Sequence, residues 1–310
     1  MTDANIEAVR DFFQEFQSRL VEKLESLDGG GKFSNERLDM PNKGYSRPRV
    51  LGGGSLFEKA AVHFTYSVGT ALPAAATERN PELAGRAFRA TALSVIVHPW
   101  NPHLPTTHMN LRMFLVDAQP EVWYFGGGFD LTPHLPYDED IRTWHENARR
   151  ACLSDTHYRQ LKKQCDEYFY LPHRNETRGI GGLFFDDYVG DNFYDSFKFV
   201  RQVGHHFLLA YETIAKRRRD LEWTEEEEDW MLIRRGRYAE FNLAIDRGTK
   251  YGLQSGRRVE SVLASLPPRA KWVYQFVPQP GSPSAKLAQY LRPGIDWLSI
   301  VDNSVDSECE

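Results

Sequence analysis

The first hydrophobic pattern along the chain has helical spacing. Apolar residues recur three or four positions apart, which places them on one face of an α-helix. The glycine triplet at residues 29–31 ends the pattern, as glycine often does at a helix C-terminus. The spacing predicts an amphipathic N-terminal helix over residues 1–28 that packs on the body of the protein. Its apolar residues are Ile6, Val9, Phe12, Phe13, Phe16, Leu20, Leu24 and Leu27.

The middle of the chain changes to a strand pattern. Stretches rich in β-branched and aromatic residues follow one another, and short turns with proline or glycine join several of them, which favours antiparallel pairing. The predicted strands are residues 88–99, 107–117, 121–127, 180–188, 237–246 and 271–277. The predicted helices between them are residues 138–152, 155–169 and 191–219, and a shorter one from Thr224.

Two charge runs of opposite sign mark the boundary between the last two of these helices. Residues 216–219 are KRRR and residues 225–229 are EEEED. Cations stabilise a helix C-terminus and anions an N-terminus, because of the helix dipole. We therefore expect the basic run to end one helix and the acidic run to begin the next, with Thr224 as its N-cap.

No internal repeat, long linker or change in composition marks a domain boundary. The order of elements predicts a single α+β domain over residues 1–310, in which helices cover a large sheet. The acidic tail, residues 303–310, is expected to be disordered.

Composition narrows the class of protein. The chain has 310 residues, of which 41% are hydrophobic and 13% aromatic, as expected of a folded globular protein. Its net charge of −5 argues against a general nucleic-acid binder, and no apolar run approaches the ~20 residues that span a membrane. Its three cysteines form no CxxC pair, which indicates a reducing compartment. Since targeting signals rarely carry the acidic residues found near this N-terminus, we expect a cytoplasmic protein.

The predicted strand over residues 107–117 is the most informative for function. His108, Asn110 and Arg112 alternate with apolar residues, so they point to one face of the sheet while the apolar residues point to the other. This pattern predicts a polar cleft over one face; an exposed face of a half-buried strand is the alternative. His98 and His103 lie upstream, but the spacing of the three histidines matches no recognised metal motif.

Two glycine-rich stretches invite comparison with phosphate-binding loops. Residues 123–133 read WYFGGGFDLTP, with Asp130 after the glycines, and residues 178–182 read RGIGG. Neither is followed by the GK[ST] sequence and helix of a phosphate loop. The glycines instead indicate a close approach of backbone to a ligand.

Many arginines fall in strand-like or glycine-flanked sequence. Arginine stays charged when buried and binds carboxylates through two hydrogen bonds, so such a set suits an aromatic-sized ligand with several carboxylates. Structural ion pairs with the many acidic residues are the alternative for each arginine. The set is Arg112, Arg174, Arg178, Arg234, Arg235, Arg237, Arg247, Arg257 and Arg258.

Several long segments resemble the oxygen-dependent coproporphyrinogen III oxidases. They are LGGGSLFEKAAV, LSVIVHPWNPHLPTTHMNLRMF, WYFGGGFDLTP, KKQCDEYFYLPHRNETRGIGGLFFDD, RRGRYAEFNLAIDRGTKYGLQSGRRVES and SLPP. They occur in the order of that family between residues 47 and 297. The resemblance implies a large, flat, mainly antiparallel sheet with helices on both faces, and a homodimer with its contact region near residues 238–273. It also implies oxidative decarboxylation of two propionates of coproporphyrinogen III to vinyl groups, giving protoporphyrinogen IX, with dioxygen as co-substrate and no organic cofactor.

The resemblance also assigns residues. It implies that His108 is a proton donor, that Asp130 holds the pyrrole N–H groups, and that Arg112 and Arg178 act with them at the catalytic site. The implied substrate-binding residues are Ser94, Asn110, Leu111, Arg112, Gly256, Arg257 and Arg258. The implied ligands of a divalent metal, whose need varies within the family, are His98, His108, His145 and His173.

The chain departs from the family pattern in three places. It has KKQC where many members have KxWC, EKAAVH where they have EKAGVN, and Gly256-Arg257-Arg258 where they have GGR. The last change places in doubt a backbone contact with a propionate. Two other functions fit the same residues: a metal-dependent oxygenase with histidine and acidic ligands, and a tetrapyrrole carrier without chemistry.

Overall fold

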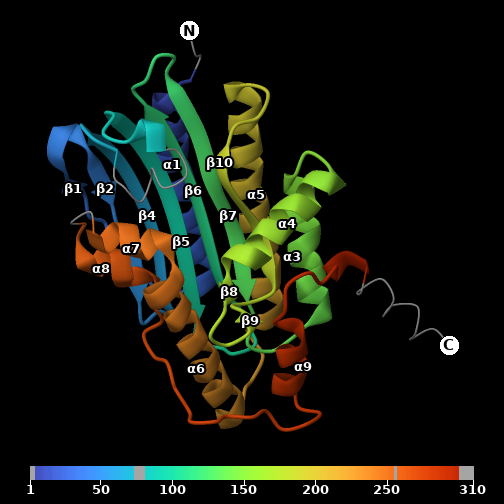
Figure 1. Cartoon of the computed structure of the whole chain (residues 1–310). Helices are drawn as coiled ribbons and strands as arrows, with labels where there is room; N and C mark the ends of the chain where they lie inside the picture. The colour runs from blue at the N-terminus through green and yellow to red at the C-terminus, as the bar shows by residue number, and fades with distance from the viewer. Residues whose placement is uncertain (1–3, 73–80, 255–256, 300–310) are drawn as a thin grey trace.

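One antiparallel sheet organises the molecule. The computed structural model describes residues 4–72, 81–254 and 257–299; the predicted tail at 303–310 lies outside them. The eight strands follow the order β1-β2-β4-β5-β6-β7-β10, with β3 also paired to β4 (Figure 1). Their bounds are β1 Leu38–Asp39, β2 Tyr45–Arg47, β3 Val50–Gly52, β4 Phe57–Gly69, β5 Phe88–Pro99, β6 Thr106–Val116, β7 Val122–Thr132 and β10 Gly181–Tyr188. A separate small pair is formed by β8 Tyr170–Leu171 and β9 Glu176–Thr177.

Helices pack on both faces of this sheet, which confirms the α+β class and the single large sheet. Helices α1 (Ile6–Asp28) and α5 (Phe193–Arg218) cover β4 to β7 on one face, and α3 (Asp138–Ala151) and α4 (Asp155–Tyr168) pack against β10. Figure 1 shows α6 (Glu225–Glu240), α7 (Arg247–Gln254) and α8 (Val259–Val262) over the other face. Among the described residues a further helix is α9 (Pro283–Tyr290), and short 3₁₀ turns occupy Pro41–Lys43, Pro81–Leu83 and Leu263–Ser265.

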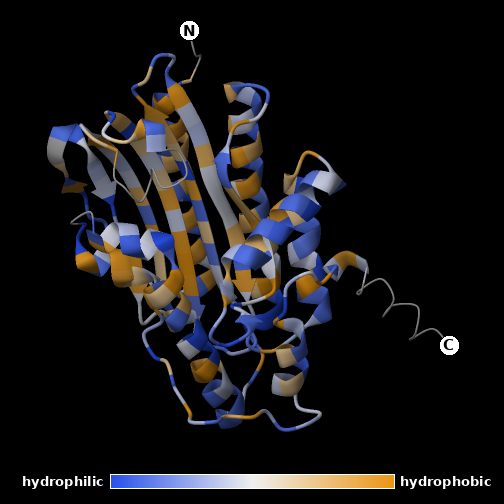
Figure 2. Ribbon diagram, viewed as in Figure 1, coloured by the Kyte–Doolittle hydropathy of each residue, from blue (hydrophilic) through white to orange (hydrophobic). Residues whose placement is uncertain are grey.

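The apolar core lies between the sheet and α1, α3 and α5. Met109, Leu111, Met113 and Leu115 of β6 are buried there together with the apolar face of α1. The alternation predicted for this strand is therefore confirmed. Figure 2 shows hydrophobic residues along the strands and hydrophilic residues over the outer surface of α4.

The end of α1 is tied to the sheet by a single carboxylate. Asp28 accepts hydrogen bonds from the backbone N–H groups of Gly31, Ser55, Leu56 and Phe57 at 2.6–3.0 Å. Burial by itself would raise the pKa of Asp28, but these bonds outweigh burial and lower it. The Asp28 carboxylate thus fixes the turn that enters β4.

Helix boundaries follow the predictions closely. Gly29 ends α1 in the left-handed conformation, with φ of +81°. Thr224 caps α6 and forms a reciprocal capping box with Glu227. The basic run ends α5 and the acidic run begins α6, as expected.

Two predicted strands are wrong and one long strand is not among the predictions. Residues 237–246 continue α6 and then form a π-helical turn, Phe241–Ile245. The buried residues Trp230, Arg234, Tyr238 and Phe241 recur three or four positions apart, which is helical spacing. Residues 271–277 form no strand, and their apolar side chains are exposed rather than paired in a sheet. The unpredicted strand is β4, in which polar residues alternate with buried ones. In the described part of the chain, no helix is long and apolar enough to cross a membrane.

Candidate functional site

A cavity of about 620 Å³ lies between the second face of the sheet and the segment from α6 to the 3₁₀ turn after α8. Its volume falls within the ~300–1,000 Å³ typical of ligand sites. The strand register determines its floor. Ser94, Asn110 and Gly128 lie side by side across β5, β6 and β7, and the next row contains Ala92, Arg112 and Gly126. These six cavity-lining residues include four of the smallest side chains, so the floor is low and nearly flat.

Two glycines of the predicted close-approach stretch have distinct steric roles. At Gly126, a Cβ atom would lie 2.7 Å from the Arg112 guanidinium, so only glycine leaves room for that group to lie on β7. At Gly128, φ is +140° and a Cβ would lie 2.0 Å from the carbonyl oxygen of Leu183. At both glycines the close neighbour is a protein group, so the predicted approach of a ligand to this backbone stays a prediction.

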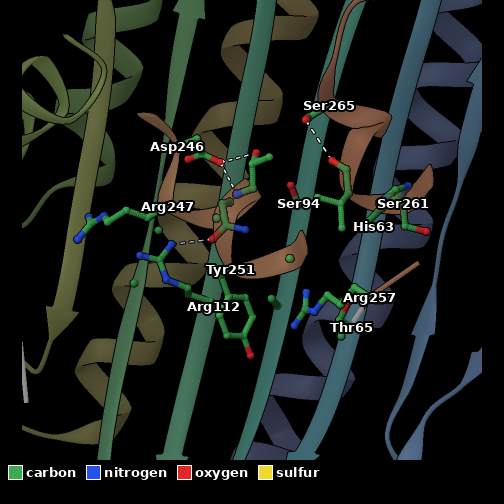
Figure 3. A pocket seen from close by; sticks show the side chains of 18 of the residues that line it. His63, Thr65, Ser94, Arg112, Asp246, Arg247, Tyr251, Arg257, Ser261 and Ser265 are labelled. Atoms are coloured by element: carbon green, nitrogen blue, oxygen red, sulfur yellow. Dashed lines mark hydrogen bonds between the residues drawn. The ribbon is translucent and has the colours of Figure 1, made fainter. Parts of the chain in front are cut away.

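Arg112 belongs to an ion-pair network that joins floor and roof. Its guanidinium contacts Asp186 on β10 and donates to Asn110 Oδ1 at 2.8 Å. Asp186 also pairs with Arg247 of α7 at 2.7 Å. Figure 3 shows Arg112 and Arg247 at the same side of the cavity. One carboxylate therefore holds two arginines from elements far apart in the sequence.

The roof is held by a second carboxylate. Asp246 caps α7, accepting from the N–H and the hydroxyl of Thr249 at 2.7 and 2.8 Å (Figure 3). It also accepts from the Tyr168 hydroxyl at 2.8 Å. Because Tyr168 stacks on Phe184 of β10, the beginning of α7 is fixed relative to the sheet.

His108, Asp130 and Arg178 form a buried cluster at one end of the floor. His108 lines the cavity and its Nδ1 donates to Asp130 Oδ1 at 3.0 Å. Arg178 donates three hydrogen bonds of 2.8–3.1 Å to the same carboxylate. Burial by itself would raise the pKa of Asp130, but Arg178 and His108 outweigh burial and lower it. Asp130 is therefore an ionised carboxylate.

The arrangement places Asp130 behind His108 rather than at the cavity surface. Asp130 is 1% exposed, and both of its oxygens accept from Arg178. The contact with pyrrole N–H groups that the resemblance implies would require this carboxylate to leave Arg178. His108, with a side chain 23% exposed, is the most exposed member of the cluster and lines the cavity.

Arg178 is enclosed by aromatic rings. Its guanidinium carbon lies 4.3 Å from the ring centres of Phe169 and Tyr238 and 4.6 Å from that of Phe241. It also donates to Asn242 Oδ1 at 3.0 Å. Burial by itself would lower the pKa of Arg178, but Asp130 outweighs burial and raises it. With its donors used by protein groups, Arg178 holds Asp130 in place and borders the cavity as a wall.

Most of the other predicted substrate-binding residues line the cavity, but Leu111 does not. Ser94 and Asn110 lie on the floor. Leu111 does not: its side chain is buried in the core on the opposite face of the sheet. Arg257 and Arg258 line the roof side of the cavity, and Gly256 lies outside the described residues.

The four histidines predicted as metal ligands are not brought together. His98 and His145 each donate to a carbonyl and accept from a hydroxyl, so their lone pairs are used. Burial lowers the pKa of both, that of His145 to about 3. His173 pairs with Glu240 at 2.8 Å, while His108 pairs with Asp130. Residues 4–72, 81–254 and 257–299 contain no group of three or more His, Cys, Asp or Glu arranged to hold a metal, so this ligand set does not fit a metal within one chain.

Sequence reasoning missed several residues that line the cavity. His63 and Thr65 project from β4, and Tyr251 and Ser261 come from α7 and α8 (Figure 3). The polar residues of β4 alternate with buried ones, and this alternation was the available signal for His63 and Thr65. For the roof residues no local pattern exists, because only the chain fold brings them over the sheet.

Fold and site together define a class: a single-sheet α+β protein that encloses a flat-floored, arginine-lined cavity with a buried His–Asp–Arg cluster at its end. A comparison with protein-family models gives the particular family. The model described as coproporphyrinogen III oxidase matches residues 8–297, nearly the whole chain. The chain belongs to the coproporphyrinogen III oxidase family, and this membership supports an oxidoreductase of haem biosynthesis that acts on a tetrapyrrole.

Proposed function

We propose that this protein catalyses the oxygen-dependent decarboxylation of two propionates of coproporphyrinogen III to vinyl groups, giving protoporphyrinogen IX. The observation that carries this proposal is the shape and charge of the cavity. Its floor of small residues accepts a broad, flat ligand, and the lining arginines Arg112, Arg247, Arg257 and Arg258 suit a ligand with several carboxylates. A small substrate would leave most of this cavity empty.

The chemistry balances with dioxygen as the electron acceptor. Each propionate becomes a vinyl group by losing its carboxylate as CO₂ and one hydrogen from the carbon attached to the pyrrole, with release of two electrons. Two such steps release four electrons, which reduce one O₂ to two waters, or two O₂ to hydrogen peroxide. The reduced macrocycle is itself electron-rich, so it can supply these electrons without an organic cofactor.

The chain's own residues orient the substrate and move protons. Arginines at the cavity wall fix the propionates, which holds one reacting carbon in place and lowers the entropic cost of reaction. The Nδ1–H of His108 donates a hydrogen bond to Asp130. Nε2 is therefore the ring nitrogen that remains to exchange a proton with the substrate. Ionised Asp130 stabilises positive charge that develops on His108 and on the nearby ring.

An anaerobic binding experiment followed by an oxygen pulse tests the proposal. The protein is mixed with coproporphyrinogen III without oxygen, and products are then followed by chromatography and by CO₂ release. The expected result is protoporphyrinogen IX with two CO₂ for each substrate. Binding without CO₂ release would instead establish a tetrapyrrole carrier, and turnover that thorough chelation abolishes would favour a metal-dependent oxygenase.

We also propose that the protein works as a homodimer through the region near residues 238–273. Several large apolar side chains of this region are exposed in the single chain, including Leu243 at 54% and Trp272 at 57%. Exposed apolar residues gathered in one region are typical of protein interfaces. Light scattering coupled to gel filtration should give the mass of two chains, and the mass of one chain would contradict this proposal.

A further inference from the structure

One corner of the cavity is walled by small and apolar side chains. Ala61 of β4, Ile96 of β5, Tyr238 of α6 and Ala264 of the 3₁₀ turn after α8 pack together there, each 1–4% exposed. All four residues also line the cavity. We call this set of four the apolar corner. It is part of the cavity, yet the residue roles described above do not use it.

The strand register places the apolar corner beside His108. Ala61 pairs with Ile96 across β4 and β5, and Ile96 pairs with His108 across β5 and β6. Residues directly opposite each other on antiparallel strands have Cβ atoms about 4.5–5.5 Å apart. A small molecule held over Ile96 therefore lies within reach of the His108 ring, which is the proton-exchanging group of the proposed function.

Tyr238 supplies the polar group of the corner. Burial raises the pKa of its hydroxyl, and the nearby Asn242 amide lowers that pKa by less, so the group is a neutral O–H. Among the described residues, this hydroxyl has no hydrogen-bond acceptor. The Tyr238 ring lies against Arg178, 4.3 Å from its guanidinium carbon, but Arg178 already donates to Asp130 and Asn242.

This composition favours an uncharged occupant. A propionate in the corner would meet one hydroxyl and, among the described residues that wall it, no unpaired cation. Burial of a carboxylate without a paired cation costs much free energy. A small uncharged molecule avoids that cost and gains from apolar surroundings.

Dioxygen is the reactant of the proposed reaction with these properties. One propionate carboxylate, one O₂ and one proton give a vinyl group, CO₂ and hydrogen peroxide. The two electrons and the hydrogen that the side chain loses pass to oxygen, and the added proton completes the peroxide. Oxygen must therefore bind next to the macrocycle and next to a proton donor. The apolar corner adjoins both the flat floor and His108.

We propose that the apolar corner is the dioxygen-binding site, with O₂ held against Ile96 and the two alanines and the Tyr238 hydroxyl donating to oxygen as it is reduced. This inference rests on the proposed function, because it takes O₂ to be the electron acceptor. It deepens that function by giving the second reactant a place separate from the arginines that suit the propionates.

Kinetics with oxygen as the varied reactant test the corner. Initial rates are measured with an oxygen electrode at saturating coproporphyrinogen III, and melting curves show that each variant is folded. Ala61→Val and Ala264→Val each add two methyl groups to the corner. Each should lower kcat/KM for O₂ about tenfold, because the added groups take the space of a diatomic molecule. The Kd of coproporphyrin III, the oxidised macrocycle, is measured by fluorescence and should stay within twofold of the wild-type value.

Ala90 offers a volume-matched control. It lines the cavity from the same strand as Ile96, but six residues, or about 20 Å, away along β5. Ala90→Val adds the same two methyl groups and should leave kcat/KM for O₂ within twofold. A fall equal to that of the corner variants would overturn the proposal.

Tyr238→Phe separates oxygen from a propionate as the occupant. It keeps the ring and removes the hydroxyl, so it should lower kcat about tenfold through loss of one hydrogen bond to charged oxygen, with the Kd of coproporphyrin III unchanged. A raised Kd in Tyr238→Phe or in the two corner valine variants, with kcat/KM for O₂ unchanged, would place the macrocycle in the corner and overturn the proposal.

An unreactive gas keeps this test separate from that of the proposed function. Xenon binds in apolar cavities of proteins, so crystals of the wild-type protein under xenon pressure should hold it in the corner, and crystals of Ala264→Val should not. If the wild type releases no CO₂ with oxygen, the proposed function fails, and the xenon result decides whether the corner takes an apolar gas. If the wild type turns over but binds no xenon there, and both valine variants keep their kcat/KM for O₂, only the corner proposal fails.

Discussion

Replacing Asp130 by asparagine removes one negative charge from the buried cluster and changes almost nothing in shape. Arg178, 2% exposed, would face a neutral amide with a single acceptor oxygen in place of the carboxylate that accepts three of its hydrogen bonds. Removing one partner of a buried ion pair typically costs about 3–5 kcal/mol, because the other charge stays buried and uncompensated. For a chain of 310 residues that loss corresponds to a fall in Tm of about 5–8 °C.

A double-mutant cycle with Arg178→Met isolates the electrostatic part of this effect. In the Arg178→Met background the buried Asp130 carboxylate has lost its cation, so Asp130→Asn should leave the unfolding free energy unchanged or raise it. Urea denaturation of the four proteins gives the coupling energy, which should exceed about 2 kcal/mol. A coupling below about 0.5 kcal/mol would refute the argument that Asp130 and Arg178 depend on each other.

The same pair predicts a pH dependence with a defined sign. The pKa of Asp130 is lowered in the folded protein, so its contribution to stability is fully present above the pKa of the unfolded chain, about 3.9. That contribution is lost as pH falls through the lower, folded-state pKa. The Tm difference between wild type and Asp130→Asn should therefore shrink below about pH 4; a difference that is constant or grows in acid would contradict the assignment.

Three further predictions follow from single positions. Gly126→Ala should displace the Arg112 guanidinium, raising KM about tenfold in a steady-state assay with little change in Tm; an unchanged KM would show that Arg112 moves freely. Asp28→Ala should cost about 3 kcal/mol in urea denaturation by leaving backbone N–H groups unsatisfied. Because the pKa of Asp28 is lowered on folding, this cost should fall in acid, and a cost independent of pH would contradict that cause. Leu111→Ala should cost about 2–5 kcal/mol yet leave the Kd for coproporphyrin III unchanged, and a weakened Kd would place Leu111 at the cavity.

Much of the fold was predictable because its signals are local. The spacing of apolar residues in 6–27 predicts one buried helical face. The alternation of polar and apolar residues in 107–117 predicts a strand with one polar and one apolar face. Thr224 and the charge runs fixed a helix boundary through capping and the helix dipole. The two incorrect strands lie in aromatic-rich sequence, where composition alone does not separate a strand from a buried helix or an exposed loop.

The site was predictable in its residue types but not in its contacts. His108, Arg112 and Ser94 line the cavity as the strand pattern and the resemblance imply. The partners of each group come from distant parts of the chain: Asp130 meets Arg178, and Arg112 meets Asp186. These pairings depend on strand register and on the course of the chain after each strand, which no local spacing encodes.

The sequence by itself determined the five longest described helices, the strands β5, β6, β7 and β10, the polar face of β6 and the family, because these depend on neighbouring residues or on long matching segments. Only the tertiary structure decided which charges remain available to a ligand. It showed Asp130 and Arg178 neutralising each other under the cavity, the histidines occupied by separate partners, and Arg257 without a carboxylate among the described residues. An ion pair forms wherever folding brings opposite charges together, and that proximity arises from segments separated by tens to hundreds of residues along the chain.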